Sequence, residues 1–178
     1  MRVLVAYASK HGATAGIAER IGMELRCSGL EVDVLPIDSV RNVANYDAYV
    51  LGSAVYIGSW MKDALLFVHQ HADTFVKRPT WLFSSGPLGD EPANGQDNDQ
   101  HEAIKPKQVT ELEEILRPRE HRIFFGALDR SDFGLRERVI AAMPGSDKLL
   151  PEGDFRNWPE IEGWAQAIAA DLEAVLTT

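Results

Sequence analysis

The sequence has a single cysteine, Cys27, among its 178 residues. One cysteine cannot form a disulfide within the chain, and it excludes a C-x-x-C redox or zinc motif. We expect Cys27 to pack beneath the first predicted helix. Long apolar runs are also missing, since none approaches the roughly 18 residues that span a bilayer, and no charged-then-apolar leader precedes the first strand. These absences predict no integral membrane segment and a reducing compartment, with the cytoplasm as the expected location.

Basic residues are scarce relative to acidic ones. The chain has 18 Lys and Arg residues against 27 Asp and Glu residues, which gives a formal net charge of −9 at pH 7. Nucleic acids and anionic membranes attract clustered Lys and Arg side chains, so neither is an expected partner. The sequence also lacks a G-x-S-x-G nucleophile elbow, a G-x-x-x-x-G-K-[ST] loop and a paired-carboxylate motif. Hydrolase and NTPase functions are therefore poor interpretations, and we predict no catalytic acid, base or nucleophile.

Candidate metal ligands do not form a convincing set. His69 and His71 are two positions apart in a helical pattern, which directs their side chains to different faces. Asp97, Asp99 and His101 lie in a polar stretch, where such residues usually serve solvation. We predict no metal site.

Apolar strands alternate with one-sided helices along the chain. The predicted strands cover residues 3–8, 31–36, 48–53, 80–84 and 122–128, and the predicted helices start near Thr14, Met61, Val109, Leu135 and Asn157. Gly29 follows the first helix as a cap, and Asn157 and Glu160 have capping-box spacing at the last one. This alternation is typical of an α/β fold, in which right-handed crossovers build a parallel sheet with helices on both faces. The sequence predicts a three-layer, doubly wound, five-stranded parallel sheet.

Residues 89–105 depart from this pattern. They are rich in Asp, Asn, Gly, Gln and Pro, and they show no apolar period. We interpret them as an exposed loop insertion and not as a linker. Residues 1–178 are therefore expected to form a single domain.

A turn with hydroxyl and glycine residues follows the first strand, where residues 9–14 have the sequence Ser-Lys-His-Gly-Ala-Thr. Backbone N–H groups at a helix N-terminus lack partners within the helix, and together with the helix dipole they form an anion site. Ser9 and Thr14 can add hydroxyl donors, and Gly12 lets the backbone approach a ligand closely. Simple capping of the helix by the same residues is the alternative, and this turn alone leaves both open.

Two later loops leave strands at the same predicted edge of the sheet. Residues 52–60 combine small residues with Tyr56 and Trp60, and residues 84–89 are small or narrow. In open α/β sheets, ligands bind beyond the carboxyl ends of the strands. Tyr56 or Trp60 can cover the face of a flat ring, although both can also be plugs over the sheet edge. The three loops together favour a phosphate-bearing ligand with a flat ring.

With these residues the sequence resembles the flavodoxin-like family. The resemblance spans nearly the whole chain and rests on the first strand with residues 9–14, on the Tyr-Asp-Ala of residues 46–48 and on residues 52–58. It implies non-covalent binding of FMN and a strand order of 2-1-3-4-5. Family members often have Thr where His11 stands and Asn where Ala13 stands.

The resemblance also implies the contacts with FMN. Its phosphate would be wrapped by Ser9, Lys10, His11, Gly12, Ala13 and Thr14. One border of the isoalloxazine ring would be formed by Ala54, Val55, Tyr56, Ile57 and Gly58, with the Ile57–Gly58 peptide near the reactive nitrogen. The other border would be formed by Ser85, Gly86, Pro87, Leu88 and Gly89.

The cofactor determines the expected function. Residues 89–105, 126–128 and 153–158 resemble, more loosely, the subgroup that contains menaquinone-dependent protoporphyrinogen dehydrogenases. We therefore expect a flavoprotein oxidoreductase that passes electrons between a reduced donor and a quinone, a porphyrin precursor or a redox protein. The third-loop aromatic and acidic residues of typical carrier flavodoxins are absent from residues 84–89. A non-enzymatic electron carrier and a flavin-free binding module are the alternatives, and the oligomeric state is left open.

Overall fold

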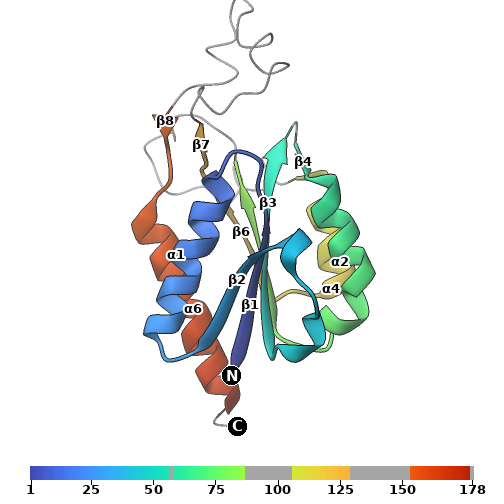
Figure 1. Ribbon diagram of the computed structural model, residues 1–178, viewed down its shortest axis with the longest axis vertical. Helices are drawn as coiled ribbons and strands as arrows, with labels where there is room; N and C mark the ends of the chain where they lie inside the picture. The colour runs from blue at the N-terminus through green and yellow to red at the C-terminus, as the bar shows by residue number, and fades with distance from the viewer. Residues whose placement is uncertain (57, 87–105, 129–152, 177–178) are drawn as a thin grey trace, which may run out of the picture.

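A parallel sheet forms the centre of the protein (Figure 1). The computed structural model describes residues 1–56, 58–86, 106–128 and 153–176. The parallel strands are β1 (Arg2–Ala8), β2 (Glu31–Pro36), β3 (Ala48–Tyr56), β5 (Thr80–Ser85) and β6 (Glu120–Phe124). They lie in the order β2-β1-β3-β5-β6, and each neighbouring pair is parallel. In chain order these are the five predicted strands, so the predicted order 2-1-3-4-5 is confirmed.

Three short strands differ from the prediction. β4 (Ser59–Trp60) pairs with β3 in the antiparallel direction and makes the sheet six-stranded. The predicted strand 122–128 is divided into β6 and β7 (Ala127–Leu128), and β7 pairs with β8 (Gly153–Asp154) in a separate antiparallel ribbon. Strands of two residues have too few positions to show an alternation of apolar and polar residues, which is why the sequence pattern did not reveal them.

Helices cover both faces of the sheet (Figure 1). α1 (Ala13–Cys27) and α6 (Trp158–Leu176) lie on one face, and α2 (Lys62–Phe75) and α4 (Lys107–Leu116) lie on the other. Two 3-10 turns, η1 (Ile37–Ser39) and η2 (Val43–Asn45), connect β2 to β3. The predicted helix at 135–143 and the predicted loop insertion at 89–105 lie outside the described residues.

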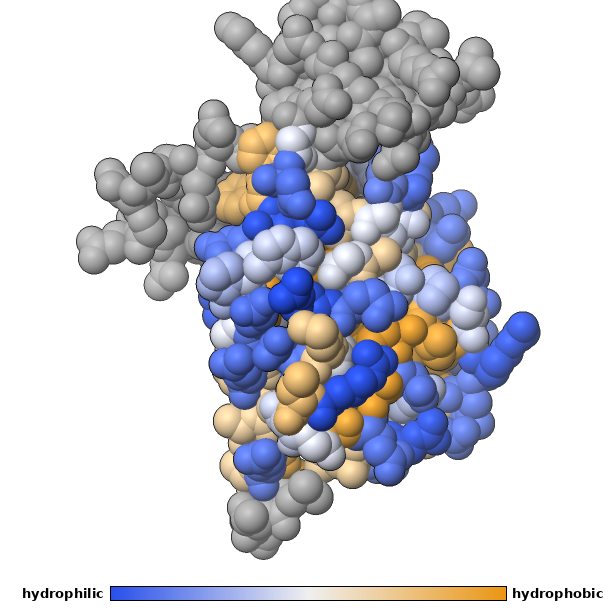
Figure 2. Space-filling model, turned by 60° about the vertical axis from the view of Figure 1, so that its left-hand side comes forward, coloured by the Kyte–Doolittle hydropathy of each residue, from blue (hydrophilic) through white to orange (hydrophobic). Residues whose placement is uncertain are grey.

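Each face of the sheet has its own hydrophobic core. Along β1, Val3 and Val5 join the cluster beneath α1 and α6, whereas Leu4 and Ala6 join the cluster on the opposite face. Strands buried on both faces are continuously apolar, as this one is. Trp164 is only 3% exposed, which confirms the expectation that it belongs to the core. On the outer surface, Figure 2 shows hydrophilic residues around smaller areas of hydrophobic ones.

The ends of two helices follow the sequence signals. Gly29 has a φ of +84° and follows α1, which confirms its predicted role as a cap. Before α6, the side-chain oxygen of Asn157 accepts the N–H of Glu160 at 3.3 Å. Cys27, however, is exposed, so the expectation of a packed thiol was wrong. It ends α1 two positions after Leu25, which takes the inward position.

Within the described part of the chain, no helix has the length and apolar character required to cross a membrane.

Candidate functional site

The carboxyl ends of β1, β3 and β5 lie side by side at one edge of the sheet. Ala8 is the register partner of Ser53, and Ser53 is the register partner of Ser84. One position further along, Ala54 is opposite Ser85. The three predicted loops therefore leave the sheet at the same edge, which is at the top of Figure 1. This is the edge at which open α/β sheets bind ligands.

The turn between β1 and α1 has the geometry of an anion site. Gly12 stands at the N-cap with a φ of +84°, and its N–H donates to Ser9 Oγ at 3.1 Å. No side chain caps α1, and its first turn contains no acidic residue. Among the described residues, none has an atom within 4 Å of a Cβ added to Gly12. The N–H groups at the positive end of the helix dipole lack a side-chain cap and can bind an anion.

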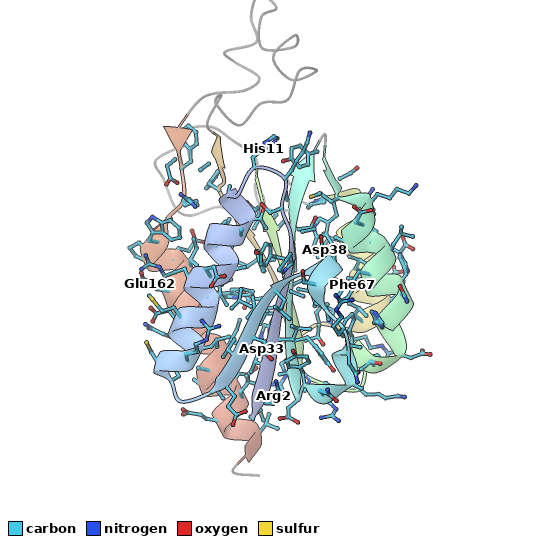
Figure 3. The ribbon with its side chains drawn as sticks, in the orientation of Figure 1. Arg2, His11, Asp33, Asp38, Phe67 and Glu162 are labelled. Carbon is cyan, nitrogen blue, oxygen red and sulfur yellow. The ribbon has the colours of Figure 1, made fainter. Side chains whose placement is uncertain are left out.

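Two basic side chains of this turn lie beside the end of β3. The ring centres of His11 and Tyr56 are 6.2 Å apart in an edge-to-face arrangement, and Lys10 Nζ lies 5.7 Å from the centre of the Tyr56 ring. Figure 3 shows His11 beyond the carboxyl ends of the strands. These contacts bring the first and second predicted loops together.

The second predicted loop is a tight antiparallel hairpin. β3 continues through Ala54, Val55 and Tyr56, and the chain then passes Gly58, whose φ is +70°, into β4. The predicted third strand therefore ended too early, because its final residues pair with β4 as well as β5. Ile57 lies outside the described residues.

The two aromatic candidates of the second loop have different environments. Trp60 is 3% exposed, belongs to the core on the α2 and α4 face, and donates its indole N–H to Ser84 Oγ at 2.8 Å. Tyr56 is 39% exposed at the edge of the sheet. Trp60 is therefore a plug beneath the site, whereas Tyr56 is placed where an aromatic ring can face a ligand.

The third predicted loop begins against the second. Ser85 ends β5, and Gly86 follows with a φ of +113°. A Cβ added to Gly86 would lie 3.5 Å from the carbonyl oxygen of Val55, an ordinary van der Waals distance, so the start of this loop lies beside the end of β3. Pro87, Leu88 and Gly89 lie outside the described residues.

A family model for the flavodoxin domain matches residues 4–148, which is more than half of the chain. The chain belongs to the flavodoxin family. Flavodoxin domains bind FMN, and FMN is the cofactor of this chain. The described residues fit that cofactor, since the first turn of α1 offers an uncapped helix N-terminus to a phosphate and the edge beside it carries an exposed aromatic ring.

Similar proteins agree with this assignment. The chain is 23% identical over 176 residues to protoporphyrinogen IX dehydrogenase [quinone] of Escherichia coli, and the alignment covers 95% of each chain. The structure of a flavodoxin from the domain Archaea is 16% identical to this chain, with a TM-score of 0.59. The superposition covers 97% of this chain and 99% of that flavodoxin. Rubredoxin oxygen:oxidoreductase of Desulfovibrio gigas has 12% identity and a TM-score of 0.65, over 99% of this chain and 37% of its own. The two solved structures share the fold.

Two surface hollows of this flavodoxin domain lie away from the carboxyl edge. One, of about 490 Å³, is lined by Trp81, Arg119 and Asp171, between the start of β6 and α6. The other, of about 390 Å³, includes Met1 and Asp47 at the opposite end of the sheet. The uncapped helix N-terminus and the converging strand ends are at the carboxyl edge, and size alone does not indicate a site.

Sequence reasoning missed an arginine that lies beside the first turn of α1. Arg156 donates to both carboxylate oxygens of Asp154, at 2.7 and 2.6 Å, and its guanidinium stacks 4.5 Å from the centre of the Trp158 ring. These hydrogen bonds hold the pKa of Asp154 below its usual value. A Cβ added to Gly16, in the first turn of α1, would lie 2.5 Å from Arg156 Nη1. Only the tertiary structure brings residues this distant in sequence together.

A hydrogen-bonded chain beneath the site was also missed. Ser84 Oγ, which accepts the indole N–H of Trp60, lies 2.8 Å from His121 Nε2 as well. The three residues belong to β4, β5 and β6. Their proximity depends on strand order and register, and the sequence carries no local signal of it.

Proposed function

We propose that this flavodoxin domain is an FMN-dependent oxidoreductase that passes electrons between a reduced donor and a quinone, a porphyrin precursor or a redox protein. Electron transfer is the function of the family. The observation that carries the proposal is the geometry of the carboxyl edge, where the anion site of α1 and the exposed Tyr56 lie side by side. A flat cofactor bound there is reachable by a second molecule from solvent.

The proposed roles of the chain are binding and orientation. The backbone N–H groups of residues 9–14 hold the phosphate, with hydroxyl groups from Ser9 and Thr14 and positive charge from Lys10 and His11. Exposed charges beside water contribute a fraction of a kcal/mol each, so the backbone provides most of this interaction.

The hairpin between β3 and β4 and the segment that begins at the end of β5 are proposed to hold the ring. Residues 54–58 are proposed to border one side and residues 85–89 the other; Gly86 of the second border lies beside Val55 of the first. Bound FMN supplies the hydride or electron chemistry. The protein orients the ring, limits access to it and adjusts its potential through backbone hydrogen bonds.

The relative of known activity supports the choice of an enzyme over a carrier. The alignment with the quinone-dependent protoporphyrinogen IX dehydrogenase extends over 95% of both chains. We therefore propose a quinone as the first acceptor to test and a porphyrin precursor as the first donor.

Anaerobic turnover tests the proposal. The FMN-loaded chain is mixed with protoporphyrinogen and a soluble quinone, and porphyrin fluorescence and quinone absorbance are recorded together. We expect many quinone molecules to be reduced per flavin. Electron exchange with a redox protein, without turnover of any small donor or acceptor, would contradict the enzyme proposal and identify a carrier.

A further inference from the structure

A single buried hydroxyl connects the structures on both sides of the proposed ring site. Ser84 is fully buried near the end of β5. Its Oγ accepts the indole N–H of Trp60 at 2.8 Å and lies 2.8 Å from Nε2 of His121. Trp60 belongs to the hairpin of the second loop, whereas His121 lies on the edge strand β6.

The direction of these hydrogen bonds follows from the chemistry of the groups. An indole N–H only donates, so Ser84 Oγ accepts from Trp60. The proton of Ser84 then needs an acceptor, and Oγ has no third polar partner among the residues that the structure describes. His121 Nε2 fills this role when the imidazole carries its proton on Nδ1. A histidine protonated at Nε2 would instead leave a buried hydroxyl proton without an acceptor.

Both borders of the ring site depend on this chain of hydrogen bonds. Trp60 is the register partner of Val55, which lies in the first border. Ser84 directly precedes the second border, where a Cβ on Gly86 would lie 3.5 Å from the carbonyl oxygen of Val55. Ser84 is therefore linked to the first border through Trp60 and to the second border through the backbone of β5. Loss of the acceptor of Ser84 is expected to loosen both links.

We propose that His121 is a positioning residue for the flavin ring, which acts by accepting the hydroxyl proton of Ser84 and thereby fixes Trp60 and the two ring borders. The proposal rests on the proposed placement of the ring beside the described ends of β3 and β5, at residues 54–56 and 85–86. It concerns the ring and not the phosphate, because the chain of hydrogen bonds joins β4, β5 and β6 and includes no residue of the turn between β1 and α1.

The experiment compares His121→Leu with His121→Gln. Leucine removes the acceptor, whereas the glutamine side chain can place an amide oxygen near the position of Nε2. Thr80→Val is the matched control: Thr80 is a buried hydroxyl at the other end of β5, where its Oγ1 donates to the carbonyl oxygen of Phe75 or Arg78, each at 3.1 Å. Dissociation constants of FMN and riboflavin are measured by quenching of flavin fluorescence, together with the visible spectrum of the bound flavin and the Tm.

We expect His121→Leu to raise both dissociation constants by the same factor, about threefold to tenfold, which is the size of one buried hydrogen bond. His121→Gln is expected to return both constants to within about twofold of the wild type. Thr80→Val is expected to lower the Tm and leave both constants and the spectrum unchanged. Ser84→Ala leaves β6 unaltered but removes both the hydroxyl donor to His121 and the acceptor of the Trp60 indole N–H. It is expected to raise both dissociation constants by at least the factor seen in His121→Leu, which also covers the case of a poorly folding His121 variant.

Three results would overturn the proposal. One is unchanged riboflavin binding in His121→Leu and Ser84→Ala. Another is a loss confined to FMN, which would indicate an effect on the phosphate. The third is a nitrogen NMR spectrum with the proton of the His121 ring on Nε2. If the wild-type chain binds neither flavin, the proposed function itself is refuted, whereas the three results above leave that function intact.

Discussion

Gly12 and Gly29 provide a matched pair for testing the anion site. Both have a φ of +84°, both lie at an end of α1, and a Cβ at either position would meet no atom within 4 Å. An alanine in this left-handed conformation is strained by about 1–2 kcal/mol. Because φ is the same and a Cβ at either position meets none of the described atoms, Gly12→Ala and Gly29→Ala are expected to lower the free energy of unfolding by similar amounts.

Flavin binding should separate the two variants. At Gly12 the strain falls on the turn whose N–H groups are proposed to hold the phosphate, and the new methyl group projects into the open space there. We expect Gly12→Ala to weaken FMN binding by at least about tenfold, or about 1.4 kcal/mol. Riboflavin, which lacks the phosphate, should lose less than about twofold, since the ring site is untouched. Gly29→Ala should change neither constant.

The assay combines urea unfolding of each variant with fluorescence titrations of FMN and riboflavin. Unfolding curves show whether the strain is equal, and the ratio of the two dissociation constants reports the phosphate contribution alone. Equal FMN affinities for the two variants would refute the placement of the phosphate at the first turn of α1. An equal loss for FMN and riboflavin at Gly12 would place the ring there instead.

Other predictions concern stability and surface chemistry. Gly163→Ala, at a helical position where a Cβ meets no described atom within 4 Å, should raise the free energy of unfolding by about 0.5–1 kcal/mol. Gly16→Ala should raise it by less, because the new methyl group displaces Arg156. Urea unfolding of both variants measures the difference. Asp154→Asn should lower stability at pH 7 by less than about 1 kcal/mol, because the carboxylate is 48% exposed. The pKa of Asp154 is lowered in the folded state, so the stabilisation by its carboxylate is complete above the ordinary carboxyl pKa and disappears as the pH falls through the lowered value. A difference in unfolding free energy between the wild type and Asp154→Asn that stays constant in acid would contradict this. Cys27 should react fully with a thiol reagent in the native protein, and protection until unfolding would contradict its exposure.

Periodic patterns in the sequence predicted the large elements of the fold. The apolar run of β1 and the apolar stripes of α1 and α6 predicted which residues of these elements are buried. The alternation of strands with helices predicted the parallel sheet. The strand order came from the family resemblance and is confirmed. Elements of two residues, such as β4 and β7, contain too little pattern to be predicted.

Details of the candidate site could be determined only from the three-dimensional structure. The sequence located the three loops correctly at one edge but could not separate Tyr56 from Trp60, because both are aromatic residues of one short segment and only packing shows which is buried. Cys27 lies two positions after Leu25, about 200° around the helix, so the helical period itself places it away from the inward stripe of α1. The contact of Ser84 with His121 depends on the register of two parallel strands.

We propose that this flavodoxin domain holds FMN at the carboxyl edge of its sheet through a phosphate site at α1. The most direct test is a visible absorption spectrum of the chain after FMN is added and free flavin is removed, with the same treatment in riboflavin. We expect about one FMN per chain, quenched flavin fluorescence and much weaker retention of riboflavin. A colourless chain after FMN treatment, or equal retention of both flavins, would contradict it.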